Sequence, residues 1–256
     1  MLTAYDYPMG VLLDQAGVDI VLVGDSLANV VLGLPSTRDV TMDEMIHHTK
    51  AVRRGVKNAL LVGDMPYCAY QANPKDAVKN AQRFIKEAGC DAIKLEWFDQ
   101  CLEVAKKIRQ AGIKVMGHVG LTPQTADQLG GLKVQGKDAI SAQKIIDHAR
   151  DLEKIGCFSV VLECVPTEVA KIITDKLSIP TIGIGAGKFC DGQVLVINDL
   201  IGISGSFNPR FVKKYANLSG NILSGVQSFI KEVKAGKFPD KQHSYTIDPQ
   251  ELRQLK

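Results

Sequence analysis

Several short apolar runs of the chain are followed by polar residues of the types that carry out acid-base and metal chemistry. These residues are Asp25, Asp64, Glu96, His118 and Glu163, with Ser26 directly after the first and Lys94 just before the third. Carboxylates crowded into a small site repel one another unless a positive charge holds them together. Oxygen ligands without cysteine suit a hard cation such as Mg²⁺, which takes one or two protein carboxylates and leaves positions for a chelating substrate. We therefore expect a Mg²⁺ site with Asp25 and Asp64 as direct ligands.

Each of these residues also has a purely structural interpretation. A carboxylate at the end of a strand can cap the helix that follows, and a single His118 can be a hydrogen-bonded core histidine. The glycine-rich loop at 183–187 could hold an anion, but Lys188 stands where a dinucleotide fingerprint needs its third glycine. We expect that loop to serve close backbone packing. Because five polar strand ends occur together, the chemical interpretation is favoured over separate capping roles.

The elements that position these residues follow a repeated pattern of helix, glycine, short apolar run and polar residue. It occurs in QAGVDIVLVGD, RRGVKNALLVGD, EAGCDAIKLE, QAGIKVMGH and KIGCFSVVLE, with glycines at 17, 55, 89, 112 and 156. A glycine often ends a helix by adopting a left-handed conformation, and an apolar run too short for a helix is typical of a buried strand. Each segment therefore predicts a helix end, a turn and a buried strand.

The intervening segments carry helix start signals. A capping box at Thr41 and Glu44, and Asn73 followed by Pro74, predict two helix N-termini. Further helices are expected over 141–156 and 168–177, and a final one extends through 222–233. TIGIG at 181–185 and QVLVIND at 193–199 are expected to be strands, which brings the number of strands close to eight.

Apolar strands alternating with amphipathic helices indicate a parallel sheet covered by helices. The strand number favours a closed (β/α)8 TIM barrel, an α/β fold, over an open doubly wound sheet. We expect one domain over 1–256, with 238–256 as a polar C-terminal extension. In such a barrel all strands end at the same face, where catalytic residues lie, so the polar strand ends should converge there.

Composition restricts the cellular role. Hydrophobic residues make up 45% of the chain, and 31 basic and 28 acidic residues are interspersed, giving a net charge of +3. No basic block points to nucleic acid as a partner, and no apolar run approaches the roughly 20 residues that span a bilayer. The six cysteines include no CxxC pair and are expected to be reduced. We expect a cytoplasmic protein that does not bind membranes.

The motifs TAYDYP, VGDSL, HTKAVRRG, GHVGLTPQ, KVQGK, LECVP, IGIGAG and DGQVLV occur in this order. In these motifs the chain resembles the ketopantoate hydroxymethyltransferases, of the phosphoenolpyruvate/pyruvate barrel superfamily. The resemblance implies a Mg²⁺-dependent transferase of pantothenate biosynthesis and a homo-oligomer, a decamer in bacterial relatives. The reaction joins 5,10-methylenetetrahydrofolate and α-ketoisovalerate (3-methyl-2-oxobutanoate), with water, to give ketopantoate (2-dehydropantoate) and tetrahydrofolate. Both partners are small molecules.

The resemblance also implies roles for individual residues. The positions that match the metal-associated carboxylates are Asp25, Asp64 and Glu96, and those that match keto-acid binding are Asp25, Ser26, Asp64 and Lys94. Glu163 matches the proton acceptor and His118 an active-site histidine. In the implied mechanism Glu163 removes the C3 proton as general base, and the metal stabilises the resulting enolate as a Lewis acid.

The chain departs from the family pattern at three positions near these residues. Trp97 and Phe98 stand where the family usually has a glycine pair, and Ala28 replaces a glycine. We expect these changes to alter packing near the barrel mouth while the chemistry is retained. Two alternatives are a keto-acid carbon-carbon lyase of the same superfamily and a catalytically weakened oligomeric barrel that acts as a binding module.

Overall fold

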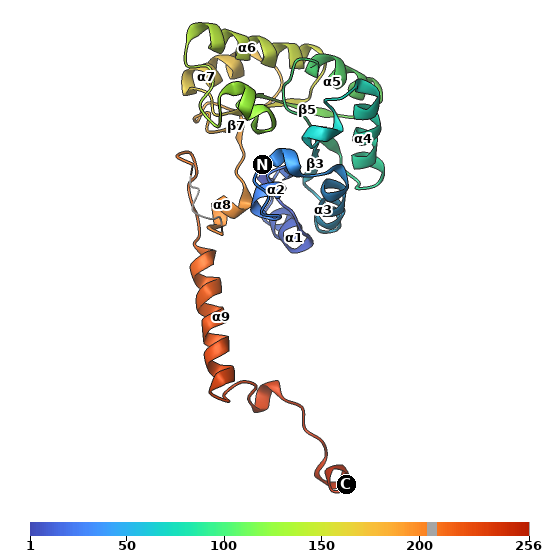
Figure 1. Cartoon of the computed structure of the whole chain (residues 1–256), viewed down its shortest axis with the longest axis vertical. Coiled ribbons are helices and arrows are strands. Elements are labelled where there is room, and N and C mark those ends of the chain that lie inside the picture. Colours follow the sequence, from blue (N-terminus) through green and yellow to red (C-terminus); the bar gives the residue numbers. More distant parts are fainter. Residues whose placement is uncertain (204–208, 256) are drawn as a thin grey trace.

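In the computed structural model, which describes residues 1–203 and 209–255, eight parallel strands form one sheet in chain order (Figure 1). The strands are β1 Leu2–Thr3, β2 Ile20–Val23, β3 Leu60–Asp64, β4 Ala92–Lys94, β5 Val115–Gly120, β6 Ser159–Glu163, β7 Thr181–Ile184 and β8 Gly192–Gln193. Leu195, just after the last strand, forms a parallel bridge with Leu2. The amino terminus also donates a hydrogen bond to the Gln193 carbonyl at 3.0 Å. The sheet thus returns to its first strand, which confirms the (β/α)8 prediction.

Helices fill the connections between the strands. They are α1 Tyr7–Gln15, α2 Leu27–Val30, α3 Met42–Gly55, α4 Pro74–Lys86, α5 Cys101–Gln110, α6 Ala139–Lys154, α7 Thr167–Lys176, α8 Ile197–Ile201, α9 Leu218–Lys234 and α10 Pro249–Leu252. Four short 3₁₀ helices are η1 Thr37–Asp39, η2 Tyr67–Ala69, η3 Pro123–Leu129 and η4 Lys241–His243. The capping box of α3 and the Asn73 cap of α4 are confirmed. Helix α6 begins two residues earlier than expected, because Asp138 caps it.

Four of the five predicted helix-ending glycines adopt the left-handed conformation, and one does not. Gly17, Gly89, Gly112 and Gly156 all have positive φ. Gly55 instead is the last residue of α3. A Cβ atom at Gly55 would lie 2.7 Å from the carbonyl oxygen of Tyr7. Helix α3 therefore ends at Gly55 as predicted, but without the left-handed glycine cap, and this glycine instead allows α3 to pack closely against α1.

The apolar side chains form two layers that meet at the strands. The residues that fill the barrel interior are Leu22, Val62, Ala92, Met116, Val161, Ile182 and Val194. A larger cluster lies between the outer face of the sheet and the helices. Because side chains alternate between the two faces of a strand, a residue two positions after an interior residue also points into the barrel. This alternation places the polar strand ends directly above the apolar interior.

The last quarter of the chain differs from the expected pattern. QVLVIND was predicted as a strand, but the strand covers only Gly192–Gln193, and Ile197 already begins α8. The reason is a distant contact: the Ile197 amide donates to the hydroxyl of Thr3, 194 positions away, at 2.9 Å and turns the chain away from the sheet. Helix α9 then extends away from the barrel (Figure 1). Within the described residues, no helix has both the length and the apolar character needed to cross a membrane.

Candidate active site

Four of the predicted site residues form the inward-facing polar layer at the carboxyl ends of the strands. Asp64, Lys94, His118 and Glu163 each follow an interior apolar residue by two positions, and Asp64 and Lys94 are register partners on β3 and β4. Asp64 and Glu163 end their strands as predicted, whereas β5 continues two residues beyond His118. The barrel interior therefore supports the polar layer on packed apolar side chains.

Asp25 and Ser26 reach the same mouth from the turn after β2. The backbone amide of Asp25 donates to Asp64 Oδ2 at 3.2 Å, which joins the ends of β2 and β3. The Ser26 hydroxyl lies 2.7 Å from the hydroxyl of Tyr5, which is buried. Tyr5 was not assigned a site role from the sequence, although it lies in the TAYDYP motif. It sets the position of the Ser26 hydroxyl at the rim.

Lys94 and Asp64 form a buried ion pair at the centre of the site. Lys94 Nζ lies 2.7 Å from Asp64 Oδ1 and 2.8 Å from Oδ2, and both side chains are at least 95% buried. Burial raises the pKa of Asp64, against the attraction of Lys94. Burial alone would lower the pKa of Lys94, but the carboxylates of Asp64, Glu96 and Asp25 outweigh it and raise that pKa. The ammonium group therefore stays charged.

A second row of ionisable groups runs from Glu96 through His118 to Glu163. His118 Nδ1 lies 3.5 Å from Glu96 Oε1, and Nε2 lies 3.3 Å from Glu163 Oε2. Neither ring nitrogen meets hydrogen-bond geometry, so the attraction is mainly electrostatic. Burial and Lys94 lower the pKa of His118, but Glu163 and Glu96 outweigh them and raise it to about 9. Burial also raises the pKa of Glu96.

The donor set of this mouth fits a divalent cation. Three buried carboxylates, those of Asp25, Asp64 and Glu96, share the positive charge of Lys94. Negative charge is in excess, and after burial itself the neighbouring carboxylates add to the rise in the pKa of Asp64 and Glu96. Asp25 Oδ2 accepts a hydrogen bond from Gln124, whereas Oδ1 accepts none from the described residues. In residues 1–203 and 209–255, no trio of His, Cys, Asp or Glu forms a metal-binding group. Mg²⁺ usually takes only one or two protein carboxylates.

Two buried residues that the sequence analysis did not single out complete the site. Gln124 lies in η3 and donates from its side chain to Asp25 Oδ2 at 2.9 Å. The Tyr70 hydroxyl donates to Gln124 Oε1 at 2.5 Å. The motif GHVGLTPQ ends at Gln124, so the motif marked the position, but the contact with Asp25 spans 99 positions in the chain.

The residues that differ from the family pattern are well packed. Trp97 stacks on His148 of α6 with ring centroids 3.7 Å apart, and Phe98 meets Tyr70 edge to face at 5.3 Å. Ala28 is fully buried. Trp97 and Phe98 thus reinforce the loop that follows Glu96.

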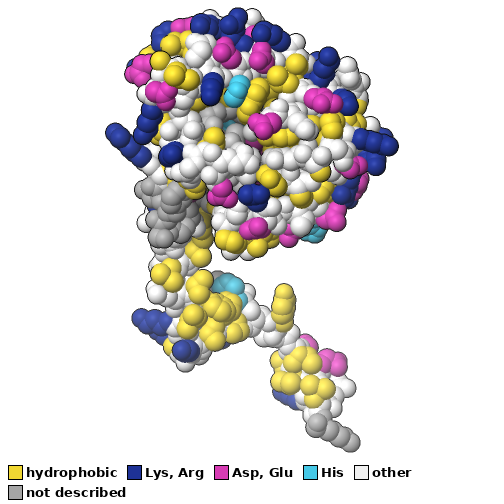
Figure 2. All heavy atoms as spheres, turned by 45° about the horizontal axis from the view of Figure 1, so that its top comes forward, with side chains coloured by type: hydrophobic (Ala, Val, Ile, Leu, Met, Phe, Trp, Pro, Cys, Tyr) yellow, Lys and Arg dark blue, Asp and Glu magenta, His cyan; other side chains and the backbone are white. Residues whose placement is uncertain are grey.

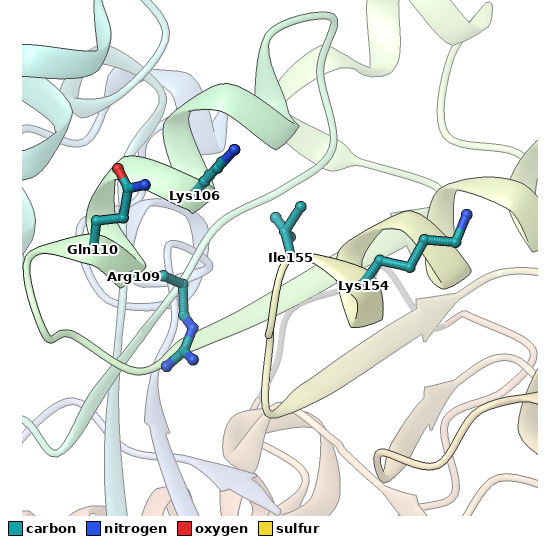
Figure 3. Close-up of a pocket in the computed structure, with 5 residues that line it drawn as sticks. All are labelled: Lys106, Arg109, Gln110, Lys154 and Ile155. Atoms are coloured by element: carbon teal, nitrogen blue, oxygen red, sulfur yellow. The ribbon is translucent and has the colours of Figure 1, made fainter.

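One hollow of the surface lies away from this mouth. It has a volume of about 360 Å³ and is lined by Lys106, Arg109, Gln110, Lys154 and Ile155 (Figure 3). These residues belong to the C-terminal ends of α5 and α6, which lie at the opposite end of the barrel from the strand ends. The dipoles of α5 and α6 favour cationic side chains at these C-terminal helix ends. Figure 3 shows Lys106 and Lys154 pointing away from Arg109 rather than converging with it.

Comparisons with known proteins agree with this architecture. A phosphonopyruvate hydrolase solved with oxalate and Mg²⁺ has a TM-score of 0.60 and 12% identity, over 98% of this chain and 87% of that chain. A phosphoenolpyruvate phosphomutase from Streptomyces platensis subsp. rosaceus also has a TM-score of 0.60, with 15% identity over 98% and 88% of the two chains. At these identities the likeness concerns the barrel fold.

Sequence relatives are much more similar. The 3-methyl-2-oxobutanoate hydroxymethyltransferase of Syntrophomonas wolfei subsp. wolfei is 53% identical over 255 residues, covering 100% of this chain and 92% of the relative. The protein of the same name from Syntrophus aciditrophicus is 57% identical over 245 residues, covering 96% and 90%. A sequence model described as ketopantoate hydroxymethyltransferase matches residues 1–241. The chain therefore belongs to the ketopantoate hydroxymethyltransferase family.

Proposed function

We propose that this protein transfers the one-carbon unit of 5,10-methylenetetrahydrofolate to α-ketoisovalerate as a hydroxymethyl group, with water supplying the hydroxyl oxygen, and so forms ketopantoate and tetrahydrofolate for pantothenate biosynthesis. The observation that carries the proposal is the buried cluster of Asp25, Asp64, Lys94 and Glu96 at the barrel mouth. It occurs in a chain whose full-length relatives bear the corresponding enzyme name. A cluster with excess negative charge suits a cation and an anionic substrate bound together.

Asp25 and Asp64 would hold the Mg²⁺ ion, with Glu96 as a third associated carboxylate. Asp25 Oδ1, which accepts no hydrogen bond from the described residues, provides one donor. The hydrogen bond of 3.2 Å from the Asp25 backbone amide to Asp64 Oδ2 keeps the two residues adjacent and supports their pairing. A phosphonopyruvate hydrolase of similar fold was solved with oxalate and Mg²⁺, and oxalate, like a 2-keto acid, offers two adjacent oxygens. When bound, the cation would supply Lewis-acid polarisation of the substrate oxygens.

The residues of the chain divide the remaining tasks between binding and proton transfer. Lys94, held charged between carboxylates, would attract the carboxylate of the keto acid, and the Ser26 hydroxyl would orient it. Glu163 ends β6 at the rim, and its side chain is 17% exposed, so it can reach a substrate in the mouth. It would accept the C3 proton as general base. His118, 3.3 Å from Glu163, would stabilise the carboxylate form of that base.

Helix α9 supports assembly into a homo-oligomer. Ile222, Leu223, Val226, Phe229, Ile230 and Val233 are between 44% and 59% exposed. Their spacing forms an apolar stripe along the helix. Figure 2 shows hydrophobic side chains gathered on the part of the chain that extends away from the barrel, whereas charged side chains are scattered over the barrel. A stripe of this size is normally covered by a partner. We propose that a second copy of the chain covers it, within the decamer that the resemblance implies.

The experiment that tests the function is direct. The full-length chain is incubated with α-ketoisovalerate and 5,10-methylenetetrahydrofolate, with Mg²⁺ or with a chelator, and ketopantoate is measured by chromatography. Product that depends on both the folate and Mg²⁺ supports the proposal. Turnover of a keto acid without folate would favour a carbon-carbon lyase, and no ketopantoate under any condition would contradict the proposal and favour a binding module.

A further inference from the structure

Gln124 and Tyr70 form a buried hydrogen-bonded relay behind the carboxylates of the site. Gln124 is 0% and Tyr70 1% exposed. They come from η3 and from the segment after η2, and they meet Asp25 after β2 and Glu96 after β4. Four separate barrel segments therefore meet at these two side chains.

The Gln124 side chain has one possible orientation. Its Nε2 group donates to Asp25 Oδ2 at 2.9 Å and to the Met65 carbonyl at 3.0 Å, which uses both amide hydrogens. Its Oε1 atom accepts from the Tyr70 hydroxyl. A reversed amide would set its oxygen against two acceptors and its NH₂ group against the hydroxyl hydrogen. The network therefore determines which Asp25 oxygen is engaged.

Glu96 is held by the same two residues. The backbone amide of Gln124 donates to Glu96 Oε2 at 3.0 Å. The backbone amide of Glu96 lies 3.4 Å from the Tyr70 hydroxyl oxygen, which accepts from it. Phe98 packs edge to face on the Tyr70 ring and restricts its movement. One oxygen of Asp25 and one of Glu96 are thus fixed by donors. Glu96 Oε1 lies 3.5 Å from His118 Nδ1, whereas Asp25 Oδ1 accepts no hydrogen bond from the described residues.

We infer that Gln124 is a positioning residue for the cation-binding carboxylates, and that Tyr70 acts on Asp25 through it. The inference rests on the proposed function, because it assigns these residues to the Mg²⁺ site. Groups that hold metal-binding carboxylates from behind set their direction, and their loss typically costs about 10–100-fold in metal affinity or activity. Neither residue needs to touch the substrate.

The test compares Gln124→Met, Tyr70→Phe and the double variant with the unmodified full-length chain. Gln124→Met keeps the length of the side chain and removes its donors. Mg²⁺ affinity is measured by titration calorimetry, together with kcat, KM and the thermal unfolding midpoint. We expect Gln124→Met to weaken Mg²⁺ binding by about 10–100-fold and Tyr70→Phe to weaken it less. Because Tyr70 acts through Gln124, the double variant should bind Mg²⁺ no more weakly than Gln124→Met.

Thr125→Val is the matched control. Thr125 is buried in the same turn, and its hydroxyl contacts Thr122 rather than a carboxylate. This variant should lose some stability but keep the Mg²⁺ affinity of the unmodified chain. Unchanged Mg²⁺ affinity in folded Gln124→Met, or independent and additive effects of the two substitutions, would overturn the positioning role. If Gln124→Met does not fold, the Mg²⁺ affinity of Tyr70→Phe is the test. An affinity equal to that of the unmodified chain would overturn the relay. Lack of Mg²⁺ binding by the unmodified chain contradicts the proposed function itself.

Discussion

Gly120 is the position where a single methyl group should disturb the active site most directly. It follows His118 by two residues and adopts φ +95° at the end of β5. A Cβ atom there would lie 2.3 Å from the Glu163 carbonyl oxygen and 2.7 Å from Val165 Cγ1. The contact is close because the amide of Leu121 donates to that carbonyl at 2.8 Å. Gly120→Ala must therefore push the ends of β5 and β6 apart.

A matched substitution at Gly112 separates the steric part of the stability loss from the cost of the left-handed backbone conformation. Gly112 has φ +83°, and an added Cβ atom would meet nothing within 4 Å. Both variants place alanine in a left-handed conformation, at about 1–2 kcal/mol, and both gain the same reduction of unfolded-state entropy. Gly120→Ala adds overpacking against backbone, about 1–3 kcal/mol. Because the other two contributions are the same at both positions, the unfolding free energy should fall by about 1–3 kcal/mol more at Gly120 than at Gly112.

Urea unfolding of the metal-free chain measures the two losses, and steady-state turnover measures their effect on the site. Only Gly120→Ala moves Glu163 relative to His118, and a displacement of about 1 Å can cost about 100-fold in rate. We expect turnover close to normal for Gly112→Ala and strongly reduced for Gly120→Ala. Equal losses of stability and equal turnover in the two variants would refute the steric reasoning.

Four further outcomes follow from the same geometry. Asp64→Ala should weaken Mg²⁺ binding and turnover together, and unchanged affinity in calorimetry would remove Asp64 from the metal site. Glu163→Gln should still bind Mg²⁺ and α-ketoisovalerate but lose exchange of the C3 hydrogen with deuterated water; near-normal exchange seen by NMR would assign the base elsewhere. Replacing both Trp97 and Phe98 by glycine should lower the unfolding midpoint without raising turnover, whereas a gain of orders of magnitude would indicate a weakened native enzyme. The pKa of His118 is raised from 6.5 to about 9 in the fold, so its stabilising charge is fully present below pH 6.5 and lost as pH rises through about 9. The difference in unfolding free energy between the metal-free chain and His118→Gln should therefore shrink from pH 6 to pH 10, and a constant difference would contradict this.

Local patterns in the chain predicted most of the barrel. The capping box at Thr41 and the cap at Asn73 lie where expected, because both depend on hydrogen bonds within a few residues. The predicted left-handed cap at Gly55 and the predicted strand at QVLVIND did not form as expected, because distant segments decide the outcome there. Gly55 packs against α1, and the chain after Gln193 is turned by a hydrogen bond from Ile197 to Thr3. Neither contact has a signature in the nearby sequence.

The sequence by itself determined which polar residues lie at the strand ends or within two residues of them, since short apolar runs and their following residues are local features. It also carried the motifs that relate the chain to its family. The tertiary structure alone decided how those residues are held: the bidentate pairing of Lys94 with Asp64, and the relay from Tyr70 through Gln124 to Asp25. These contacts join residues 30 to 99 positions apart. Periodicity can report which face of a strand a side chain occupies, but only the closure and register of the barrel bring those side chains within hydrogen-bond distance.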